Sequence, residues 1–334
     1  MIRNVITIKN SISIGICTSN DEKTIKKLLI NLSRDFVPEN NNDQKSTLDP
    51  HAVVINELII VSSGCTDNTE KIISKFTCKY PEKILLVIEN KRSGKANALN
   101  RIFEHSTGEY LVLIPADALT SLHNIYILIN QINQNQNIGI AFGKPIINHK
   151  NHNCTTICKM NSVLWNMHTK AFVLKENIHA SGELMVIRNN LFPNIPEIII
   201  NDDAYLSQIV FQSHKQIIFD PHAIVLITGP TILKDYLNQR KRIYLGHKQL
   251  KTLGFSETVP FNRLLANNKL FYLKLFLNEI NSFKNLTYLN LALIIEFYLK
   301  LRVRLSLTND FSNTNLWKRI RVDFPPSKVS KNAD

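Results

Sequence analysis

The sequence predicts an α/β fold with a doubly wound, mostly parallel sheet flanked by helices, followed by a C-terminal helical appendage. Short apolar or β-branched segments alternate with segments of helical spacing from residue 12 to residue 131, a pattern typical of β-α-β units. The composition then shifts near Gly254 toward apolar helices rich in Leu, Phe and Tyr. We therefore predict an α/β domain over 1–252 and an amphipathic helical region with a basic tail over 253–334.

The first half of the chain supplies four predicted strands, each followed by a turn and a helix. Ile12–Cys17 alternates and is β-branched, whereas Glu57–Val61 is continuously apolar, as expected of a strand buried on both faces. The expected strands are 12–17, 57–61, 84–89 and 110–114, and the expected helices are 24–32, 70–76, 96–105 and 122–131. The polar, Asn-rich residues 35–51 predict an extended surface loop.

The second half continues the alternation less regularly. We expect strands at 138–145, 181–188, 216–219 and 223–228, with a turn at 220–222, and helices at 155–174, 204–212, 230–251, 269–277 and 286–305. Ligands bind beyond the carboxyl ends of the strands in such a sheet. The turns at Asn20, Ser63, Lys95 and Asp117 all follow strands, so they should converge on one crevice.

Composition narrows the classes of partner. The 334 residues are 44% hydrophobic and 20% charged, which excludes a disordered chain. The formal net charge of +13 attracts nucleic acid, anionic lipid or phosphorylated substrates. No homeodomain, zinc-finger or RNP-like pattern is present, so we expect no nucleic-acid partner.

Cysteine usage and hydropathy indicate the compartment. The five cysteines are odd in number and form no CxxC pair, which argues against zinc and favours reduced thiols in a cytoplasmic protein. The N-terminus lacks signal-peptide features, and no apolar run is long enough to span a bilayer. Charges interrupt the apolar segments of 269–305, which leaves two interpretations open. One is peripheral contact with the cytoplasmic membrane face, and the other is a helix hairpin packed on the α/β body.

Two clusters suggest group-transfer chemistry. Asp202 and Asp203 open a predicted helix, and a cationic cluster at 239–242 follows downstream. A carboxylate that accepts a proton, with cations that hold a diphosphate, suits transfer from an activated anionic donor, although adjacent Asp residues also cap helices. Gly94-Lys95 is no P-loop because Ala96 replaces the required Ser or Thr, and no GxGxxG follows the first strand.

The motifs at the strand ends occur in a recognisable order. They are Thr18-Ser-Asn-Asp-Glu22, Ile-Ile-Val-Ser-Ser-Gly-Cys-Thr-Asp67, Ser-Gly-Lys-Ala-Asn-Ala-Leu-Asn100, Ala116-Asp117, Ser-Gly-Glu-Leu-Met185, Asp202-Asp203 and Gln239-x-x-Arg242. From about Ser11 to Leu250 this set resembles the processive-type family-2 glycosyltransferases of the GT-A fold, the group that includes cellulose and hyaluronan synthase catalytic domains.

The resemblance implies a role for each motif. Asp203 would be the catalytic base that takes the acceptor hydroxyl proton in an inverting transfer, and Asp202 would raise the pKa of one carboxyl of the pair. Asp117 would bind a divalent cation, Mg²⁺ or Mn²⁺, that bridges the donor diphosphate. The resemblance further implies donor-binding positions at Thr18, Asn20, Asp21, Ser63, Asp67, Lys95, Gln239, Arg240 and Arg242, and acceptor-side positions at Gly182 and Glu183.

Three departures from the family pattern qualify these expectations. Ser62-Ser63 replaces the paired Asp that recognises the donor base, which leaves a UDP- or GDP-type donor open. Pro115 replaces the first acid of the DxD motif, so the cation should bind weakly unless His222 or His247 helps. Ile243 replaces the tryptophan of QxxRW, which favours addition of one sugar to a glycan, lipid or small-molecule acceptor.

Two other functions compete with this interpretation. The missing acids at 62–63 and 115 also fit a degenerate member that binds a nucleotide-sugar or lipid without catalysis. A sugar-nucleotidyltransferase would need a glycine-rich, arginine-containing loop after the first strand, and residues 17–22 contain none.

Overall fold

The structure is a computed structural model that describes residues 10–36, 53–148, 155–172, 179–255 and 283–305. Its strands are β1 (Asn10–Thr18), β2 (Val53–Ser63), β3 (Ile84–Glu89), β4 (Tyr110–Pro115), β5 (Ile138–Ile147), β6 (Met185–Arg188) and β7 (Gln216–Ile227). Its helices are α1 (Ile25–Ser33), α2 (Thr69–Lys79), α3 (Lys95–His105), α4 (Leu122–Gln134), α5 (Thr156–Phe172), α6 (Asp202–Gln212), α7 (Leu233–Thr252) and α10 (Phe283–Leu305). Two 3₁₀ turns lie at Arg34–Phe36 and Asn189–Leu191.

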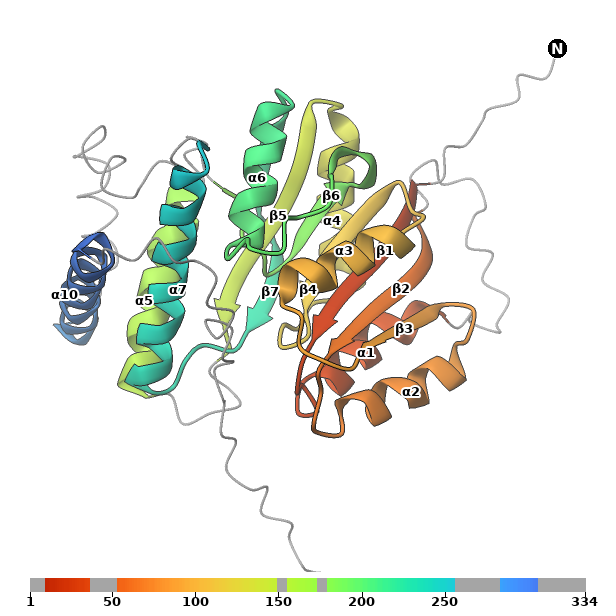
Figure 1. Ribbon diagram of the computed structural model, residues 1–334, viewed down its shortest axis with the longest axis horizontal. Coiled ribbons are helices and arrows are strands. Elements are labelled where there is room, and N and C mark those ends of the chain that lie inside the picture. The colour runs from red at the N-terminus through yellow and green to blue at the C-terminus, as the bar shows by residue number, and fades with distance from the viewer. Residues whose placement is uncertain (1–9, 37–52, 149–154, 173–178, 256–282, 306–334) are drawn as a thin grey trace, which may run out of the picture.

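The seven strands form one twisted sheet in the order β3-β2-β1-β4-β6-β5-β7, flanked by helices (Figure 1). β6 runs antiparallel to β4 and β5, and every other neighbouring pair is parallel. The predicted α/β class with a mostly parallel sheet is confirmed. The first four parallel strands, in the order β3-β2-β1-β4, end at the same edge of the sheet.

Both faces of the sheet are buried, which explains the continuously apolar strands. In β2, Leu58 and Ile60 point into a core formed with α1, α2 and α4. Ile59 and Val61 alternate into a second core formed with α3 and α6. Strand residues that must be apolar on both faces lose the alternation of a half-exposed strand.

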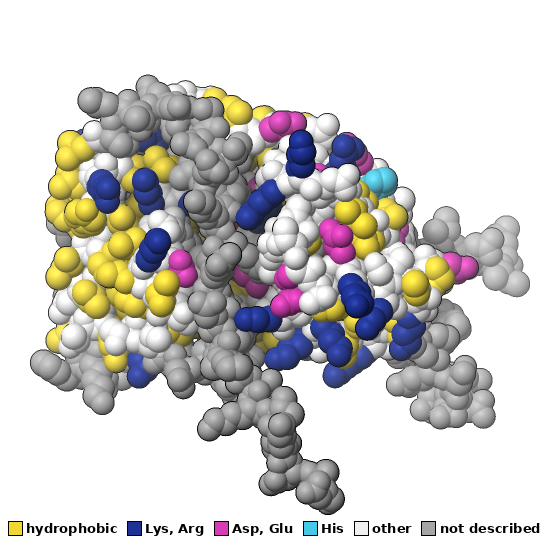
Figure 2. All heavy atoms as spheres, turned by 60° about the horizontal axis from the view of Figure 1, so that its bottom comes forward, with side chains coloured by type: hydrophobic (Ala, Val, Ile, Leu, Met, Phe, Trp, Pro, Cys, Tyr) yellow, Lys and Arg dark blue, Asp and Glu magenta, His cyan; other side chains and the backbone are white. Residues whose placement is uncertain are grey.

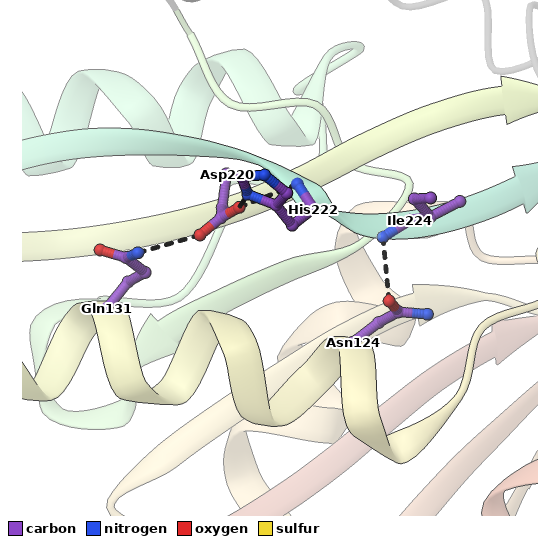
Figure 3. Close-up of polar contacts among 5 residues, drawn as sticks. All are labelled: Asn124, Gln131, Asp220, His222 and Ile224. Carbon is purple, nitrogen blue, oxygen red and sulfur yellow. Dashed lines mark hydrogen bonds and ion pairs between the residues drawn. The ribbon is translucent and has the colours of Figure 1, made fainter.

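The predicted turn at 220–222 is wrong, because one strand runs through it. β7 continues from Gln216 to Ile227, and its register against β5 shifts between the pairs Phe142–Phe219 and Lys144–Ile224. α4 holds this irregular stretch, as Figure 3 shows: Gln131 donates to the buried Asp220 carboxylate at 2.9 Å, and the Ile224 amide donates to Asn124 Oδ1 at 3.1 Å. A bulge thus replaces the break that Asp-Pro suggested.

The predicted strand 181–188 is also too long. β6 starts at Met185, and residues 182–183 form a turn. The other described elements begin or end within a few residues of their predicted bounds. Residues 37–51 of the loop predicted over 35–51, the helix at 269–277 and Cys154 lie outside the described residues. Within the described residues, Cys17, Cys65, Cys78 and Cys158 form no disulfide.

The C-terminal helix lies beside the α/β body. Figure 1 shows α5, α7 and α10 next to one another, away from the right-hand strands. Leu289 and Ala292 of α10 are buried against side chains of α5 and α7, including Met160 and Tyr236. No helix within the described residues combines the length and the apolarity that crossing a bilayer requires. The predicted boundary between 252 and 253 coincides with the end of α7 and remains a prediction.

Candidate active site

The turns after β1 and β2 are joined by hydrogen bonds. Asn20 adopts a left-handed conformation with φ of 59°, which Asn tolerates better than most residues. Its Oδ1 accepts hydrogen bonds from the backbone amides of Thr66 at 2.7 Å and Asp67 at 3.3 Å. The two turns that the sequence predicts to converge therefore do meet.

Three of the predicted donor-binding side chains organise these turns. Asp21 Oδ2 accepts from the Thr18 hydroxyl and from the Ser19 amide, each at 2.9 Å. Asp67 Oδ1 accepts from the Thr69 amide at 2.9 Å, two residues on, which is an Asx turn leading into α2. Thr18, Asp21 and Asp67 thus shape these two turns through contacts within the chain.

The turn after β3 approaches the turn after β2 closely. Ser63 Oγ accepts from the Ser93 amide at 3.3 Å. Gly64 has φ of +58°, and a Cβ there would lie 2.7 Å from the Arg92 backbone nitrogen. Glycine therefore lets the Arg92 turn close over the end of β2. Arg92 is exposed as a whole residue, but partial desolvation lowers the pKa of its guanidinium, and the nearby Arg242 lowers it further.

An ion pair joins the basic turn to the acidic pair. Lys95 Nζ lies 2.6 Å from Asp202 Oδ2, and both side chains are largely buried. Burial alone would lower the pKa of Lys95, but Asp202 and then Asp203 outweigh it and raise that pKa above its usual value. Asp202 is therefore paired with a permanent cation.

Asp203 has a different environment from its neighbour. It is half-buried in the first turn of α6, where the helix dipole favours a negative charge. Its Oδ1 accepts from the Ala204 amide at 2.7 Å, and its Oδ2 accepts from the Gly182 amide at 3.3 Å. Gly182 thus lies beside the candidate base, and its acceptor-side role remains a prediction.

Two more acids gather near this carboxylate. Burial raises the pKa of Glu183 to about 7, and Asp117 and Asp203 add to that rise, while Lys95 and Arg242 oppose it. Burial also raises the pKa of Asp117, again opposed by Lys95 and Arg242. Three carboxyl groups and two cations from five separate segments therefore interact electrostatically.

The cationic helix is divided between two roles. Arg242 and Gln239 are half-buried. Arg242 lowers the pKa values of Arg92, Asp117 and Glu183. Arg240 instead binds Glu296 of α10 with its Nε at 2.6 Å and Nη2 at 2.7 Å. Tyr236 and Tyr244 also donate to Glu296, at 2.7 Å and 2.5 Å. The structure thus places Arg240 in the joint between α7 and α10.

The two histidines considered as metal ligands contact other residues. His222 is 83% exposed at its side chain and contacts Asp220, as Figure 3 shows. His247 packs edge to face on His179 with ring centroids 5.1 Å apart, and burial lowers its pKa to about 4. The described residues contain no group of three His, Cys, Asp or Glu arranged to hold a metal ion. A cation at Asp117 would therefore need ligand oxygens from a bound substrate.

Sequence reasoning did not assign roles to three residues of this region. Arg92 lies in the basic turn that contains Lys95, and the positive charge of that turn was the available signal. His179 precedes the Gly182 turn without a motif. Glu296 is the one acid in the sequence of α10, and an acid between apolar neighbours signals a buried partner.

Comparison with known proteins places this arrangement in a family. The sequence model described as Glycosyl transferase family 2 matches residues 13–195, more than half of the chain. The poly-beta-1,6-N-acetyl-D-glucosamine synthase of Staphylococcus epidermidis is 24% identical over 224 residues, which are 62% of this chain and 51% of that protein. The synthase of the same name from Staphylococcus aureus strain COL is 30% identical over 94 residues, 28% of this chain and 22% of that one. The chain thus spans about half the length of the first of these relatives.

A solved structure supports the fold independently. The mannosyltransferase PcManGT from Pyrobaculum calidifontis, solved in complex with GDP-Man and Mn²⁺, superimposes with a TM-score of 0.54 at 18% identity. The match covers 90% of this chain and 81% of that one. At this identity the likeness shows the shared architecture.

Proposed function

Since the chain belongs to glycosyl transferase family 2, we propose that it transfers a sugar from a nucleotide-diphosphate sugar to an acceptor hydroxyl. The observation that carries the proposal is geometric: Lys95 Nζ lies 2.6 Å from Asp202 Oδ2, and the Gly182 amide donates to Asp203 Oδ2 at 3.3 Å. Glu183, Asp117 and Arg242 lie within electrostatic reach of these groups. Carboxylates and cations facing one another suit a reaction that removes a proton at one atom and releases a diphosphate at another.

Asp203 is the general base of this proposal. Because Asp202 is bound to Lys95, Asp203 is the member of the pair whose Oδ2 faces the Gly182 turn. It takes the proton of the acceptor hydroxyl while that oxygen attacks the anomeric carbon, and the bond to the donor diphosphate breaks. A single displacement of this kind inverts the anomeric configuration.

Arg242, with Gln239, holds the leaving diphosphate. Negative charge grows on that group as the bond breaks, so fixed cations and donors nearby stabilise the transition state. Arg92 and Arg242 are like charges within electrostatic reach of each other. An anion between them would relieve their repulsion, which supports a diphosphate at this position.

Asp117, with the diphosphate oxygens of the donor, would hold a divalent cation, Mg²⁺ or Mn²⁺. The cation neutralises charge on the diphosphate when bound. Two half-buried acids of this region, Asp117 and Glu183, repel each other, since Asp117 raises the pKa of Glu183. With a single DxD acid present, we expect weak cation binding in the absence of donor. The Mn²⁺ and GDP-Man of PcManGT support a cation and donor of these classes.

A screen of donors tests this function. The thermal midpoint of the protein is measured with UDP- and GDP-sugars, with Mn²⁺ and with EDTA, since a ligand bound to the folded state raises it by mass action. We expect a Mn²⁺-dependent rise with one nucleotide class, lost in Arg242→Ala. If the thermal midpoint rises but no nucleotide is released with any acceptor class that is tried, the result would favour the degenerate member that binds without catalysis. No rise with any donor would contradict the proposal.

We also propose that α10 contacts an anionic membrane surface. Its outer face is apolar: Phe297 is 72% exposed, Ile294 66% and Leu305 69%. Exposed Lys300, Arg302 and Arg304 lie on the same helix. Figure 2 shows hydrophobic side chains with interspersed cations gathered on the left of the molecule, the side on which Figure 1 shows α10. Apolar side chains flanked by cations match the acyl boundary and the anionic headgroups of a bilayer.

A further inference from the structure

The segment that leads into the acidic pair is bound to the helix that carries Arg242. Asn201, the residue before Asp202, is only 7% exposed. Its Nδ2 donates to the backbone carbonyl of Ile243 in α7 at 3.0 Å. The contact lies one residue from Arg242 on one side and two residues from Asp203 on the other.

Gly246 provides the space for this contact. A Cβ on Gly246 would overlap the Asn201 side chain, at 2.5 Å from both Nδ2 and Oδ1. Those atoms belong to a buried side chain that is hydrogen-bonded to α7, so they cannot swing into solvent. A residue larger than glycine would push α7 and the Asn201 segment apart.

Gln249 makes a second connection one turn further along α7. Its Oε1 accepts from the Ile200 amide at 3.0 Å, and its Nε2 donates to the Ile198 carbonyl at 2.6 Å. The side chain is 1% exposed. Both ends of one buried carboxamide therefore bind the backbone of the segment that precedes the acidic pair.

These contacts connect the segment before Asp203, the proposed base, to the helix that carries Arg242, the proposed diphosphate ligand. Asp203 follows the bound segment at the start of α6, and Arg242 lies on α7, so nothing in the local sequence fixes their separation. Small displacements of reacting groups cost large factors in rate, as much as about a hundredfold for about 1 Å. A direct connection between these elements therefore has a catalytic consequence beyond packing.

We propose that Asn201, Gly246 and Gln249 form a positioning clamp that sets the distance between the Asp203 carboxylate and the Arg242 guanidinium. The catalytic part of this proposal rests on the proposed glycosyl transfer. The clamp residues act through the groups they hold and touch no substrate. Arg242 stays in place to bind the diphosphate when the clamp is only disturbed, and the turns after the strands also hold the nucleotide. Disturbing the clamp should therefore lower turnover far more than it weakens nucleotide binding.

A mutant cycle tests the clamp. Gly246→Ala, Asn201→Ala and the double variant are compared by nucleotide release from the accepted sugar donor, and by calorimetric binding of the matching nucleotide, UDP or GDP, with Mn²⁺. We expect Gly246→Ala to lower kcat about tenfold or more with Kd within about twofold. In the Asn201→Ala background, the added methyl enters vacated space, so it should change kcat by less than about twofold. Lys251→Ala, exposed on the same helix, is the control and should match the wild type.

Two results would overturn the clamp. One is a folded Gly246→Ala variant with wild-type kcat, or, if that variant does not fold, a wild-type kcat in Asn201→Ala. The other is a crystal structure of either variant in which the separation of Asp203 and Arg242 is unchanged. The crystal structure tests the clamp even if the wild type binds no nucleotide. Absence of nucleotide binding would count against the proposed function and not against the clamp.

Discussion

Asp202 and Asp203 are adjacent and chemically identical, yet the fold gives them different tasks. Asp202 is buried against Lys95, whose cation neutralises it. Asp203 is half-buried, and its carboxylate accepts hydrogen bonds from the backbone amides of Ala204 and Gly182. The ion pair with Lys95 therefore distinguishes Asp202 from Asp203. This lysine lies more than a hundred residues earlier in the chain.

Glu183 should make the stability of the protein depend on pH. Its folded pKa is raised from 4.5 to about 7, so the folded chain keeps a proton that the unfolded chain releases. Stability should fall as the pH rises from about 4.5 to 7, because the folded state binds more protons in that window. Glu183→Gln removes the titration. We expect urea unfolding to show a stability gain for this variant that grows between pH 5 and pH 8.

The matched control for this measurement is Glu82→Gln, at an exposed position on the surface. Its stability relative to the wild type should stay constant with pH. If the gain of Glu183→Gln is also constant from pH 5 to pH 8, the carboxyl does not titrate in this range and the account of its environment is wrong.

At the scale of elements, α10 is held to α7 by a buried cluster of charge and hydroxyl groups. Glu296 accepts from Arg240, Tyr236 and Tyr244. Burial alone would raise the pKa of Glu296, but Arg240 and these hydrogen bonds outweigh it and hold the pKa below its usual value. The joint thus depends on one acid.

Removing that acid should destabilise the protein. Glu296→Ala leaves the Arg240 guanidinium largely buried without its carboxylate, and breaking such a pair costs about 3 kcal/mol of unfolding free energy. The matched control is Glu104→Ala, which breaks an ion pair with Arg101 in which both side chains are about half exposed. Chemical denaturation should show a clear loss for the first variant and little for the second. Equal losses would contradict the account of the joint.

The elements themselves were largely predictable, because their signals are local. β3 matches its predicted bounds, since an apolar strand between polar turns has clear ends. β7 was predicted as two strands because Asp220-Pro221 is a strong turn signal. The contacts of Gln131 and Asn124 that hold the bulge come from α4, about ninety to a hundred residues away, and no local pattern encodes them.

For the whole molecule, the outer face of α10 should determine binding to anionic vesicles. Replacing Phe297 with Asp puts a charge at the centre of the apolar face, so we expect sedimentation with phosphatidylglycerol vesicles to drop at least about tenfold. Ile88→Asp, at a position 52% exposed on the edge strand β3, is the control and should bind as the wild type does. If the wild-type protein sediments with neither anionic nor neutral vesicles, the outer face of α10 is not a membrane contact.

The candidate site was predictable where strand ends carry it. Asn20, Ser63, Lys95 and Asp117 follow parallel strands, and the sheet brings their turns to one edge. Arg240 shows the limit of this reasoning. Its place near Arg242 in the sequence suggested a shared role, but neighbouring helix residues face different directions. Only the packing of α10 on α7 shows that Arg240 binds Glu296. The roles of the site residues in catalysis remain predictions.

The central claim is that Asp203 is the base of a sugar transfer from a nucleotide donor. The measurement that tests it most directly compares wild type and Asp203→Asn in two quantities: the Kd of the donor with Mn²⁺, and the rate of nucleotide release with acceptor present. The account predicts an unchanged Kd and a rate lower by about a hundredfold or more, since asparagine keeps the shape but cannot accept the proton. A variant that releases nucleotide at the wild-type rate would contradict the account.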